Sequence, residues 1–442
     1  MNYITLFGAG RSSIYLIEYL QSWCINNQYK IKIGDVNCDY AIKHLKNHTQ
    51  LEFINININD LQHVEEIIGN SRLIVSLLPP SLHLTIANIC INKKIHLATA
   101  SYVSEGMKKL NDEAKKNDLI FLNEIGLDPG IDHMSAMAIF DELKNKGAQI
   151  TEFESYCGGL IANECDGENP WKYKFSWNPS NVVLAGQGGI AKFLLNNEIK
   201  LTPYHHLFKQ SQKIDIDGNV YETYANRDSL SYIEQYGLNN VKTMIRGTLR
   251  KNGYCSAWQL LVNLGLTDNT TVIDLPIESK AIEWLKMYIT DSGENIEKTL
   301  KEKYNASESD IEKIKWLGLL SEIKLPITKG TSAQLLEEVL KSKWTLEEND
   351  RDLIVMIHKI KYELGNESKE ITSTLELEGE NKIHTAMAKT VGLPLAIACK
   401  LILENKIKQR GVLIPTDKEI YEPVLEELKK YGIVFNEYEK LT

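Results

Sequence analysis

The stretch that decides the fold stands at the start of the chain, where Tyr3-Ile4-Thr5-Leu6-Phe7 runs directly into Gly8-Ala9-Gly10-Arg11-Ser12-Ser13. The apolar run predicts a buried strand, and the pattern over residues 12–24 predicts the helix that follows it. The first glycine permits a tight turn, and the second lets the backbone approach a pyrophosphate at the helix N-terminus. Ser13 stands where the usual fingerprint has a third glycine, and it is small enough for close helix–strand packing. The stretch therefore predicts a dinucleotide-binding turn.

The same alternation of strands and helices continues to about residue 125. Expected strands lie at 3–7, 30–33, 52–56, 73–77, 96–98 and 120–123, and expected helices at 12–24, 39–46, 61–68, 82–93 and 105–116. Strands that alternate with helices pair in parallel through right-handed crossovers, so residues 1–125 are predicted to form a doubly wound Rossmann sheet. The helix expected at 383–403 carries small residues such as Ala386, Gly392 and Ala396. We therefore expect residues 383–442 to return to this domain.

The rest of the chain has a different pattern. Residues 126–280 and 346–382 mix strand patterns with turns and glycine pairs, which predicts a mixed α/β substrate-binding and dimerisation domain. Residues 281–345 are helical, charged and poor in glycine, which predicts a helical subdomain inserted into it. The predicted fold class is α/β, with a Rossmann doubly wound parallel sheet and a second, mixed α/β domain.

Composition narrows the class of protein. The 442 residues carry a net charge of −9, whereas a duplex-binding protein needs a basic face, so nucleic acid is not an expected partner. No stretch approaches the roughly 18 uninterrupted apolar residues of a spanning helix, so no membrane is expected either. The seven cysteines form no CxxC pair, which predicts a reduced, cytoplasmic protein. The sequence has no cysteine–histidine cluster of the kind that binds a metal, so no metal is expected. The exposed sheet edges of such a fold favour a homodimer.

The carboxyl ends of the predicted strands supply the other nucleotide contacts. Asp35 ends the second strand, where a carboxylate accepts hydrogen bonds from a ribose 2′-hydroxyl and repels a 2′-phosphate, so we predict NAD rather than NADP. Leu77-Leu78-Pro79 ends the fourth strand at the same edge of the sheet. The expected cofactor-binding residues are Gly8, Gly10, Arg11, Ser12, Ser13, Asp35, Asn57, Leu77, Leu78 and Pro79.

Arginine is scarce in this chain. Seven of the 50 basic residues are arginine, and Arg227, Arg246 and Arg250 lie within 24 consecutive positions. A guanidinium grips a carboxylate through two parallel hydrogen bonds, which lysine cannot do. The clustering predicts a ligand with more than one carboxylate. The alternative is that Arg246 or Arg250 pairs with a local acid such as Asp228.

Two segments follow the fifth and sixth predicted strands, at the rim that carries the glycine turn. They are Thr99-Ala100-Ser101-Tyr102 and the run from Asn123 to His133. Asp128 precedes Pro-Gly, which is also a common turn former, and a histidine at a helix start is commonly a cap or a core residue. The residues alone do not decide whether these segments have a structural role, as a turn and a core histidine, or a functional role at the rim of the sheet.

Five segments, in order along the chain, resemble the glutamate-forming saccharopine dehydrogenases. They are 123–133, 155–159, 173–177, 226–229 and 246–250, with a continuation at 386–389 and 391–394. This resemblance covers nearly the whole chain. It implies a Rossmann domain, a substrate and dimerisation domain and a helical insertion, with saccharopine bound in the cleft between the first two.

The resemblance also implies an activity and a set of residues. The implied reaction is the reversible oxidation of saccharopine, with NAD(P)⁺ and water, to L-glutamate and 2-aminoadipate 6-semialdehyde in lysine metabolism. Asp128 and Tyr102 are the candidates for proton transfer. The implied substrate contacts are Ser101, Tyr102, Leu127, Asp128, Pro129, Trp177, Arg227, Thr248, Leu249 and Arg250.

Two departures and two alternatives accompany this resemblance. Fungal members of the family use NADP, whereas Asp35 points to NAD, and Lys251-Asn252-Gly253-Tyr254 stands where the family often has Tyr-Gln-Gly-Phe. One alternative is a reductase of a related carboxylated imine, such as a carboxy-polyamine, whose pocket should be lined by acids. The other is a non-catalytic relative that binds NAD.

Overall fold

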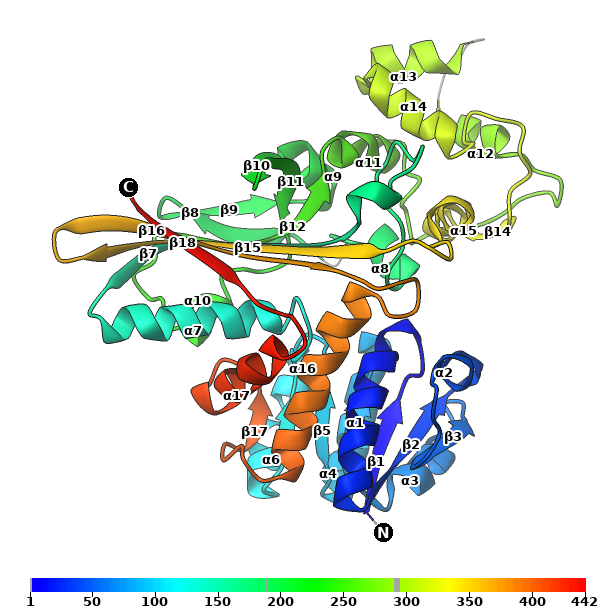
Figure 1. Cartoon of the computed structure of the whole chain (residues 1–442). Coiled ribbons are helices and arrows are strands. Elements are labelled where there is room, and N and C mark those ends of the chain that lie inside the picture. Colours follow the sequence, from blue (N-terminus) through cyan, green and yellow to red (C-terminus); the bar gives the residue numbers. More distant parts are fainter. Residues whose placement is uncertain (1, 188, 290–294) are drawn as a thin grey trace. The chain divides into compact units, whose positions relative to one another are not determined.

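The computed structural model describes residues 2–187, 189–289 and 295–442. The chain forms two compact units. Unit 1 comprises Met1–Ala148 and Ile383–Phe435, and unit 2 comprises Gln149–Lys382 and Asn436–Thr442. Both units are therefore built from segments that are far apart in the sequence (Figure 1).

Unit 1 contains a seven-stranded sheet in which every neighbouring pair is parallel. The predicted Rossmann sheet is confirmed, and a seventh strand from the C-terminal part of the chain extends it beside β6. Valine, isoleucine and leucine dominate the central strands because helices cover both faces of such a sheet. In spatial order the strands are β17 (Gly411–Leu413), β6 (Ile120–Leu122), β5 (His96–Thr99), β4 (Ser71–Ser76), β1 (Asn2–Phe7), β2 (Tyr29–Asp35) and β3 (Leu51–Asn55).

Helices pack on the sheet of unit 1 and on one another. The side chains of α3, α4, α5 and α6 share a buried core with β1, β4, β5 and β6, while α1 and α16 lie side by side (Figure 1). The helical segments are η1 (Arg11–Ser13), α1 (Ile14–Asn27), α2 (Asp39–His44), α3 (Leu61–Ile68), η2 (Pro80–Leu82), α4 (His83–Lys93), α5 (Glu105–Lys108), α6 (Asn111–Lys116), α7 (Ile131–Asn145), α16 (Ala386–Leu403) and α17 (Lys418–Lys429).

A glycine brings α16 close to the start of α1. A Cβ atom added at Gly392 would lie 3.0 Å from the backbone nitrogen of Leu16 and 3.2 Å from the carbonyl oxygen of Ser12. The small residue of the C-terminal helix thus serves contact with another helix. Helix α16 is long and apolar enough to cross a membrane by length and composition alone, but 78% of it is buried inside the protein, as expected of a core helix.

Two boundaries in unit 1 differ from those expected. Helix α7 follows residue 125 but belongs to unit 1, because it packs on α17. Tyr421 of α17 also donates a 2.5 Å hydrogen bond to Asp141 of α7. The single helix expected at 105–116 is two short helices, α5 and α6, separated by a turn at Lys109 and Leu110.

Unit 2 is built on a mixed sheet of nine strands. Seven of them follow the order β10-β11-β12-β7-β15-β16-β18, with β8 and β9 attached at β12, and the β12–β7 pair is parallel. The strands are β7 (Gln149–Ile161), β8 (Ala191–Leu195), β9 (Glu198–Thr202), β10 (Gln212–Ile216), β11 (Asn219–Ala225), β12 (Thr243–Lys251), β15 (Asp352–Leu364), β16 (Glu367–Glu378) and β18 (Asn436–Leu441). Strand β18 pairs with β16, so residues 436–442 lie in unit 2 rather than with the rest of the C-terminal segment.

Helices α8, α9, α11, α12, α13, α14 and α15 of unit 2 share one aromatic core. Trp171, Trp258, Trp284 and Trp344 are all fully buried in it, and they come from inside and outside the stretch 281–345. That stretch is helical as expected, but it packs as part of unit 2. The remaining elements are η3 (Asn163–Cys165), α8 (Pro179–Val183), α9 (Tyr204–Leu207), η4 (Phe208–Gln210), α10 (Tyr232–Gln235), α11 (Tyr254–Asn263), β13 (Val272–Asp274), α12 (Ala281–Met287), α13 (Ile296–Tyr304), α14 (Glu308–Trp316), β14 (Lys329–Thr331) and α15 (Ser332–Trp344).

Candidate functional site

The glycine turn of unit 1 joins β1 to α1 at the carboxyl edge of the parallel sheet. Gly8 has φ +106°, and an added Cβ would lie 3.0 Å from the Cβ of Leu77, so both conformation and space require glycine there. Gly10 has φ −81°, which any residue adopts, and an added Cβ there would meet nothing within 4 Å. The fold itself therefore does not require glycine at position 10, whereas a phosphate close to the backbone would.

Asp35 ends β2 beside this turn. One of its carboxylate oxygens accepts the Ala9 N–H at 2.6 Å, and the other accepts the Asn37 N–H at 3.2 Å. The Asp35 carboxylate thus holds the glycine turn against the end of β2. Its hydrogen bonds within the chain account for an acid at this position without a ribose.

A cation stands near the same strand end. Arg11 is exposed at the turn, and burial raises the pKa of Tyr40 in α2 while the positive charge of Arg11 opposes that shift.

Ser13 is buried and donates to the carbonyl of Gly10 at 2.8 Å, so it fixes the turn. Asn57 is exposed after β3 and caps its own turn by accepting the Asn59 N–H.

The segments after β5 and β6 pack on each other. This agrees with the prediction that both lie at the same edge of the sheet. The Glu124 N–H donates to the carbonyl of Ser101 at 3.0 Å, and the Glu124 carboxylate accepts the Val103 N–H at 2.9 Å. His133 lies 2.8 Å from the second carboxylate oxygen and is fully buried. His133 is therefore a core residue that supports the loop, which was one of the two readings left open.

Two glycines shape the loop that carries Asp128. A Cβ added at Gly130, where φ is +146°, would lie 2.1 Å from the carbonyl oxygen of Gly126, and one at Gly126 would lie 2.9 Å from the Cβ of Ala100. The loop is thus held close to the segment that carries Ser101 and Tyr102. Leu127 and Pro129 are buried, and Asp128 and Tyr102 are half-buried.

In unit 2, strand β12 carries three predicted substrate residues but not on one face. Thr248 lies opposite Tyr224 of β11, and Arg250 lies opposite Glu222. Since side chains alternate along a strand, Leu249 points to the other face, where it is fully buried in an apolar cluster. Leu249 is a packing residue, whereas Thr248 and Arg250 share a face.

Arg250 is a buried cation surrounded by aromatic rings. Its guanidinium carbon lies 5.3 Å from the ring centroid of Tyr254, 5.4 Å from that of Tyr173 and 5.9 Å from that of Tyr224. Only 5% of Arg250 is exposed. Within the described residues no carboxylate lies within the 4.0 Å of an ion pair, and its Nε has no hydrogen-bond partner.

Glu222, the acid opposite Arg250 on β11, forms its hydrogen bonds with backbone groups instead of with Arg250. Its two oxygens accept the N–H groups of Gly253 and Cys255 at 2.9 and 2.7 Å, at the start of α11. Nη1 of Arg250 donates to the carbonyl of Leu249 at 2.9 Å. The charge on Arg250 is thus desolvated without a carboxylate among the described residues, an arrangement that an anionic ligand would stabilise.

Neutral polar groups line the same cage. Burial raises the pKa of Tyr224 to about 12, with the charge of Arg250 opposing the shift, so Tyr224 stays a hydroxyl donor at neutral pH. The hydroxyls of Tyr173 and Tyr224 are both buried without hydrogen-bond partners in the described structure. Trp177 packs at the edge of this cluster. Sequence reasoning missed Tyr224 and Tyr254, which nothing but their cross-strand or helical position near Arg250 could have indicated.

The other two clustered arginines have different surroundings. Arg246 is buried with its guanidinium carbon 4.4 Å from the ring centroid of Tyr232. Arg227 is exposed, in a left-handed conformation with φ +46°, on the turn after β11. Asp228 forms an ion pair with Lys192 at 3.5 Å, and it is not the partner of Arg250.

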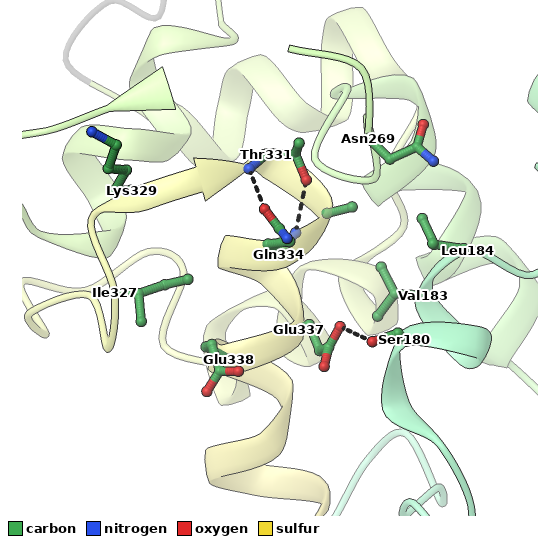
Figure 2. A pocket seen from close by; sticks show the side chains of 11 residues that line it. Ser180, Val183, Leu184, Asn269, Ile327, Lys329, Thr331, Gln334, Glu337 and Glu338 are labelled. Carbon is green, nitrogen blue, oxygen red and sulfur yellow. Dashed lines mark hydrogen bonds between the residues drawn. The ribbon is translucent and has the colours of Figure 1, made fainter. Parts of the chain in front are cut away.

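A pocket elsewhere in unit 2 contains none of the predicted site residues. It has a volume of about 480 Å³ and lies between α8 and α15 (Figure 2). Its walls use their own polar groups, because Ser180 donates to Glu337 at 2.6 Å, and Thr331 and Gln334 cap the start of α15. Among the residues that the structure describes, no group of three His, Cys, Asp or Glu side chains could hold a metal.

The fold and the turn first define a class, namely α/β proteins with a dinucleotide-binding unit and a mixed-sheet second unit. The model of the saccharopine dehydrogenase NADP binding domain matches residues 4–122, and that of the saccharopine dehydrogenase C-terminal domain matches residues 126–433. This chain belongs to the saccharopine dehydrogenase family.

Similar proteins agree with this membership. The L-glutamate-forming, NADP⁺ saccharopine dehydrogenase of Saccharomyces cerevisiae is 34% identical over 423 residues, 91% of this chain and 94% of that protein. The mitochondrial alpha-aminoadipic semialdehyde synthase of Rattus norvegicus is 33% identical over 446 residues, 98% of this chain but 47% of that protein. The chain thus spans about half the length of this second relative.

One solved structure agrees with this family membership, and a second shares the fold. The apo saccharopine dehydrogenase (L-Glu forming) of Saccharomyces cerevisiae matches with a TM-score of 0.86 and 30% identity, over 100% of both chains. The homospermidine synthase of Legionella pneumophila in complex with NAD matches with a TM-score of 0.55 and 9% identity, covering 99% of this chain and 91% of that one. The second match shows a shared fold alone.

These comparisons correct the cofactor prediction. We predicted NAD, with NADP disfavoured by Asp35, and this is wrong: the matching family model describes an NADP binding domain, and the yeast relative is named for NADP⁺. The physical reason lies in the hydrogen bonds of Asp35, which join it to the backbone N–H groups of Ala9 and Asn37. A carboxylate at the end of β2 therefore does not by itself show that the protein prefers NAD over NADP.

Proposed function

We propose that this protein catalyses the reversible oxidation of saccharopine, with NADP⁺ and water, to L-glutamate and 2-aminoadipate 6-semialdehyde in lysine metabolism. The names of the similar proteins support this reaction. The observation that carries it is the cage around Arg250, a buried guanidinium with no carboxylate partner among the described residues. Saccharopine brings three carboxylates, and an arginine in such a cage selects for them.

The NADP site belongs to the glycine turn of unit 1. The open space at Gly10 and the N-terminus of the helical segment fit a pyrophosphate, and the exposed guanidinium of Arg11 is the candidate for the 2′-phosphate. Ser12 and the backbone of Leu77, Leu78 and Pro79 complete the proposed contacts, while Asp35 keeps the turn in place. When bound, this cofactor accepts or returns the hydride.

The chain's own residues bind the carboxylates and orient the amine. Arg250 and Arg227 anchor two carboxylates, and the left-handed backbone of Arg227 supports a functional role, because such strain costs about 1–3 kcal/mol and persists where the structure enforces it. Thr248 and Ser101 donate hydrogen bonds, and Trp177 lines the cage. Leu127 and Pro129 shape the loop through packing.

Asp128 and Tyr102 are the proposed proton-transfer residues. Oxidation at the carbon beside the secondary amine gives an imine, to which water adds before the carbon–nitrogen bond breaks. One group must take a proton from that water and another must protonate the departing amine of glutamate. Asp128 and Tyr102 lie on neighbouring, half-buried loops of unit 1 and are suited to these two steps.

The two alternatives are less favoured. A carboxy-polyamine substrate calls for acids around its amines, whereas the Arg250 cage is cationic and lined with tyrosines. A non-catalytic nucleotide-binding relative would have no use for a desolvated guanidinium in unit 2.

We also propose that the protein is a cytoplasmic homodimer. All seven cysteines are free thiols, six of them buried, which suits a reducing compartment. The outer strands of the unit 2 sheet offer edges to a second copy. Light scattering on the purified chain measures the mass, and a monomeric mass contradicts the dimer.

The test is an assay of the full chain with glutamate, the semialdehyde and either NADPH or NADH. We expect oxidation of the cofactor that depends on both amino-acid substrates, with a higher kcat/KM for NADPH. Arg227→Ala should raise the KM for saccharopine strongly and leave the Kd for NADPH unchanged. The absence of turnover with either cofactor contradicts the proposed activity. Unchanged saccharopine kinetics in Arg227→Ala contradict the proposal that Arg227 binds a substrate carboxylate.

A further inference from the structure

A buried histidine joins two serines in unit 1. Ser76 ends β4, His83 begins α4 and Ser101 follows β5. The Oγ of Ser76 lies 2.8 Å from Nδ1 of His83, and the Oγ of Ser101 lies 2.7 Å from Nε2. Ser76 is 0% exposed and His83 5%, while Ser101 is half-buried. His83 has no part in the function proposed above.

The hydrogen bonds decide which ring nitrogen of His83 carries the proton. Burial lowers the pKa of His83 to about 4, so the ring is neutral at neutral pH and has one N–H. If Nδ1 carried it, the ring would donate to Ser76, whose own buried hydroxyl proton would then have no acceptor, since His83 is its one hydrogen-bond partner in the described structure. A buried donor without an acceptor is costly.

The other tautomer satisfies these groups. The hydroxyl of Ser76 donates to Nδ1, and the N–H on Nε2 donates to Ser101. The Oγ1 of Thr99 lies 3.5 Å from Nε2, which is too long to compete with Ser101 at 2.7 Å. The structure therefore favours a directional relay from Ser76 through His83 to Ser101.

This relay fixes the direction of the Ser101 hydroxyl. The Oγ of Ser101 accepts from His83, and its own proton has no acceptor among the described residues. The backbone on both sides is also held, because the Ser101 N–H donates to Thr99 Oγ1 at 3.2 Å and its carbonyl accepts the Glu124 N–H at 3.0 Å. A hydroxyl fixed as a donor selects an acceptor, and a carboxylate oxygen is the strongest of these.

We propose that His83 is a positioning residue that sets the Ser101 hydroxyl as a hydrogen-bond donor to a carboxylate of the substrate. The identity of that ligand rests on the proposed function. The direction of the relay rests on the distances and the burial of Ser76, His83 and Ser101 alone.

Two neutral variants of the full chain separate positioning from packing. The amide of glutamine reaches the place of Nε2 and can still donate to Ser101, whereas the shorter amide of asparagine reaches only the place of Nδ1. We expect His83→Asn to raise the KM for saccharopine about tenfold, which corresponds to the loss of one hydrogen bond, with kcat and the Kd for NADPH unchanged. His83→Gln should stay within about threefold of the parent, and Ser101→Ala should match His83→Asn.

The double variant gives the decisive comparison. If His83 acts through Ser101, adding His83→Asn to Ser101→Ala should cause no further loss. Effects that add, or equal losses in His83→Asn and His83→Gln, show that the histidine only packs.

A spectroscopic readout covers the cases in which His83→Asn does not fold or the parent shows no turnover. Two-bond ¹H–¹⁵N spectra of the parent report the tautomer of each histidine, and the signal absent from His83→Gln identifies residue 83. The proton is expected on Nε2, and a proton on Nδ1 overturns the relay. Because this measurement needs no substrate, failure of the relay and failure of the proposed activity are distinguished.

Discussion

At the scale of single residues, Arg250 carries a charge that the described part of the fold does not neutralise. Desolvating an ion costs several kcal/mol unless a partner compensates, and the rings of Tyr173, Tyr224 and Tyr254 compensate only partly. A residue of this kind lowers the stability of the free protein and raises the affinity for an anion. Stability and binding can therefore be separated at this position.

Replacing Arg250 by methionine should stabilise the protein while removing its substrate binding. The change keeps most of the side-chain volume and removes an uncompensated buried charge, so the free energy of unfolding should rise by about 1–4 kcal/mol. The KM for saccharopine should rise at least about a hundredfold, as two charge-assisted hydrogen bonds are lost. Thermal unfolding and steady-state kinetics measure the two effects.

The next residue along β12 is the matched control. Lys251 is also a buried cation, but its Nζ lies 2.9 Å from Asp166 and 2.9 Å from the side-chain oxygen of Asn163. Lys251→Met leaves Asp166 without its partner and should destabilise the chain by about 3 kcal/mol. If Arg250→Met and Lys251→Met destabilise alike, Arg250 is a structural residue.

His83 gives the chain a defined dependence of stability on pH. Burial lowers its pKa from 6.5 to about 4, so the unfolded chain binds the proton first as the pH falls. The stability that neutral His83 contributes is present above pH 6.5 and is lost between pH 6.5 and about 4. The full loss is about 3 kcal/mol.

The comparison with His83→Gln isolates this effect from the titration of carboxylates. The difference in unfolding free energy between the parent and this variant should shift against the parent as the pH falls through that range. Urea denaturation at four or five pH values measures it. A difference that does not vary with pH shows that His83 is not buried in its neutral form.

Sequence reasoning reached these residues unevenly, and the reason is hydrogen bonding across strands. The scarcity of arginine pointed to Arg250 without any knowledge of its surroundings. Asp35 stands at the predicted strand end, but its hydrogen bonds to the N–H groups of Ala9 and Asn37 form only in the folded chain. The partners of His83, at positions 76 and 101, follow from strand order rather than from any local pattern.

At the scale of elements, the turn before α1 has two glycines with different requirements. Gly8 is required by its backbone conformation, whereas Gly10 has an ordinary φ and open space beside it. Gly10→Ala should therefore leave the melting temperature unchanged and weaken NADPH binding at least about tenfold, because a methyl group would occupy the space of a phosphate. Fluorescence titration with NADPH measures the Kd, and an unchanged Kd contradicts a phosphate at this turn.

Gly392 of α16 presents the opposite case. An added side chain would press on the backbone of Ser12 and Leu16 in α1 and its preceding turn. Gly392→Val should therefore destabilise the chain by about 1–3 kcal/mol through overpacking. Thermal unfolding measures this loss, with Gly10→Ala as the control at the same helix start. A melting temperature equal to that of the control shows that the two helices can move apart freely.

Elements were easier to predict than their grouping. Strong alternation of apolar and polar runs predicted all six strands of the first 125 residues, and β15 and β16 likewise arise from β-branched runs. The stretch 281–345 is helical, but it shares the tryptophan core of Trp171 and Trp258. Core sharing depends on which apolar faces meet, and periodicity does not encode that.

At the scale of the whole molecule, β18 completes unit 2 from the far end of the chain. All six of its residues are exposed, and it pairs with β16 along one edge. Deleting residues 436–442 should lower the stability and expose β16 as a new edge prone to association. Light scattering should report larger assemblies, while the Kd for NADPH should not change, since unit 1 keeps all its residues. Weakened NADPH binding contradicts the division of the chain into these units.

The discontinuous make-up of both units has a consequence for the order in which the protein can fold during synthesis. The first 148 residues leave the ribosome without α16, α17 and β17, which are made only after the whole of 149–382. Domains commonly fold one after another as they emerge, but here unit 1 lacks part of its residues until 383–435 are translated, and unit 2 lacks its last strand until 436–442 are translated. The glycine turn before α1 is therefore made long before α16, the helix that packs beside it, which is translated only after residues 149–382.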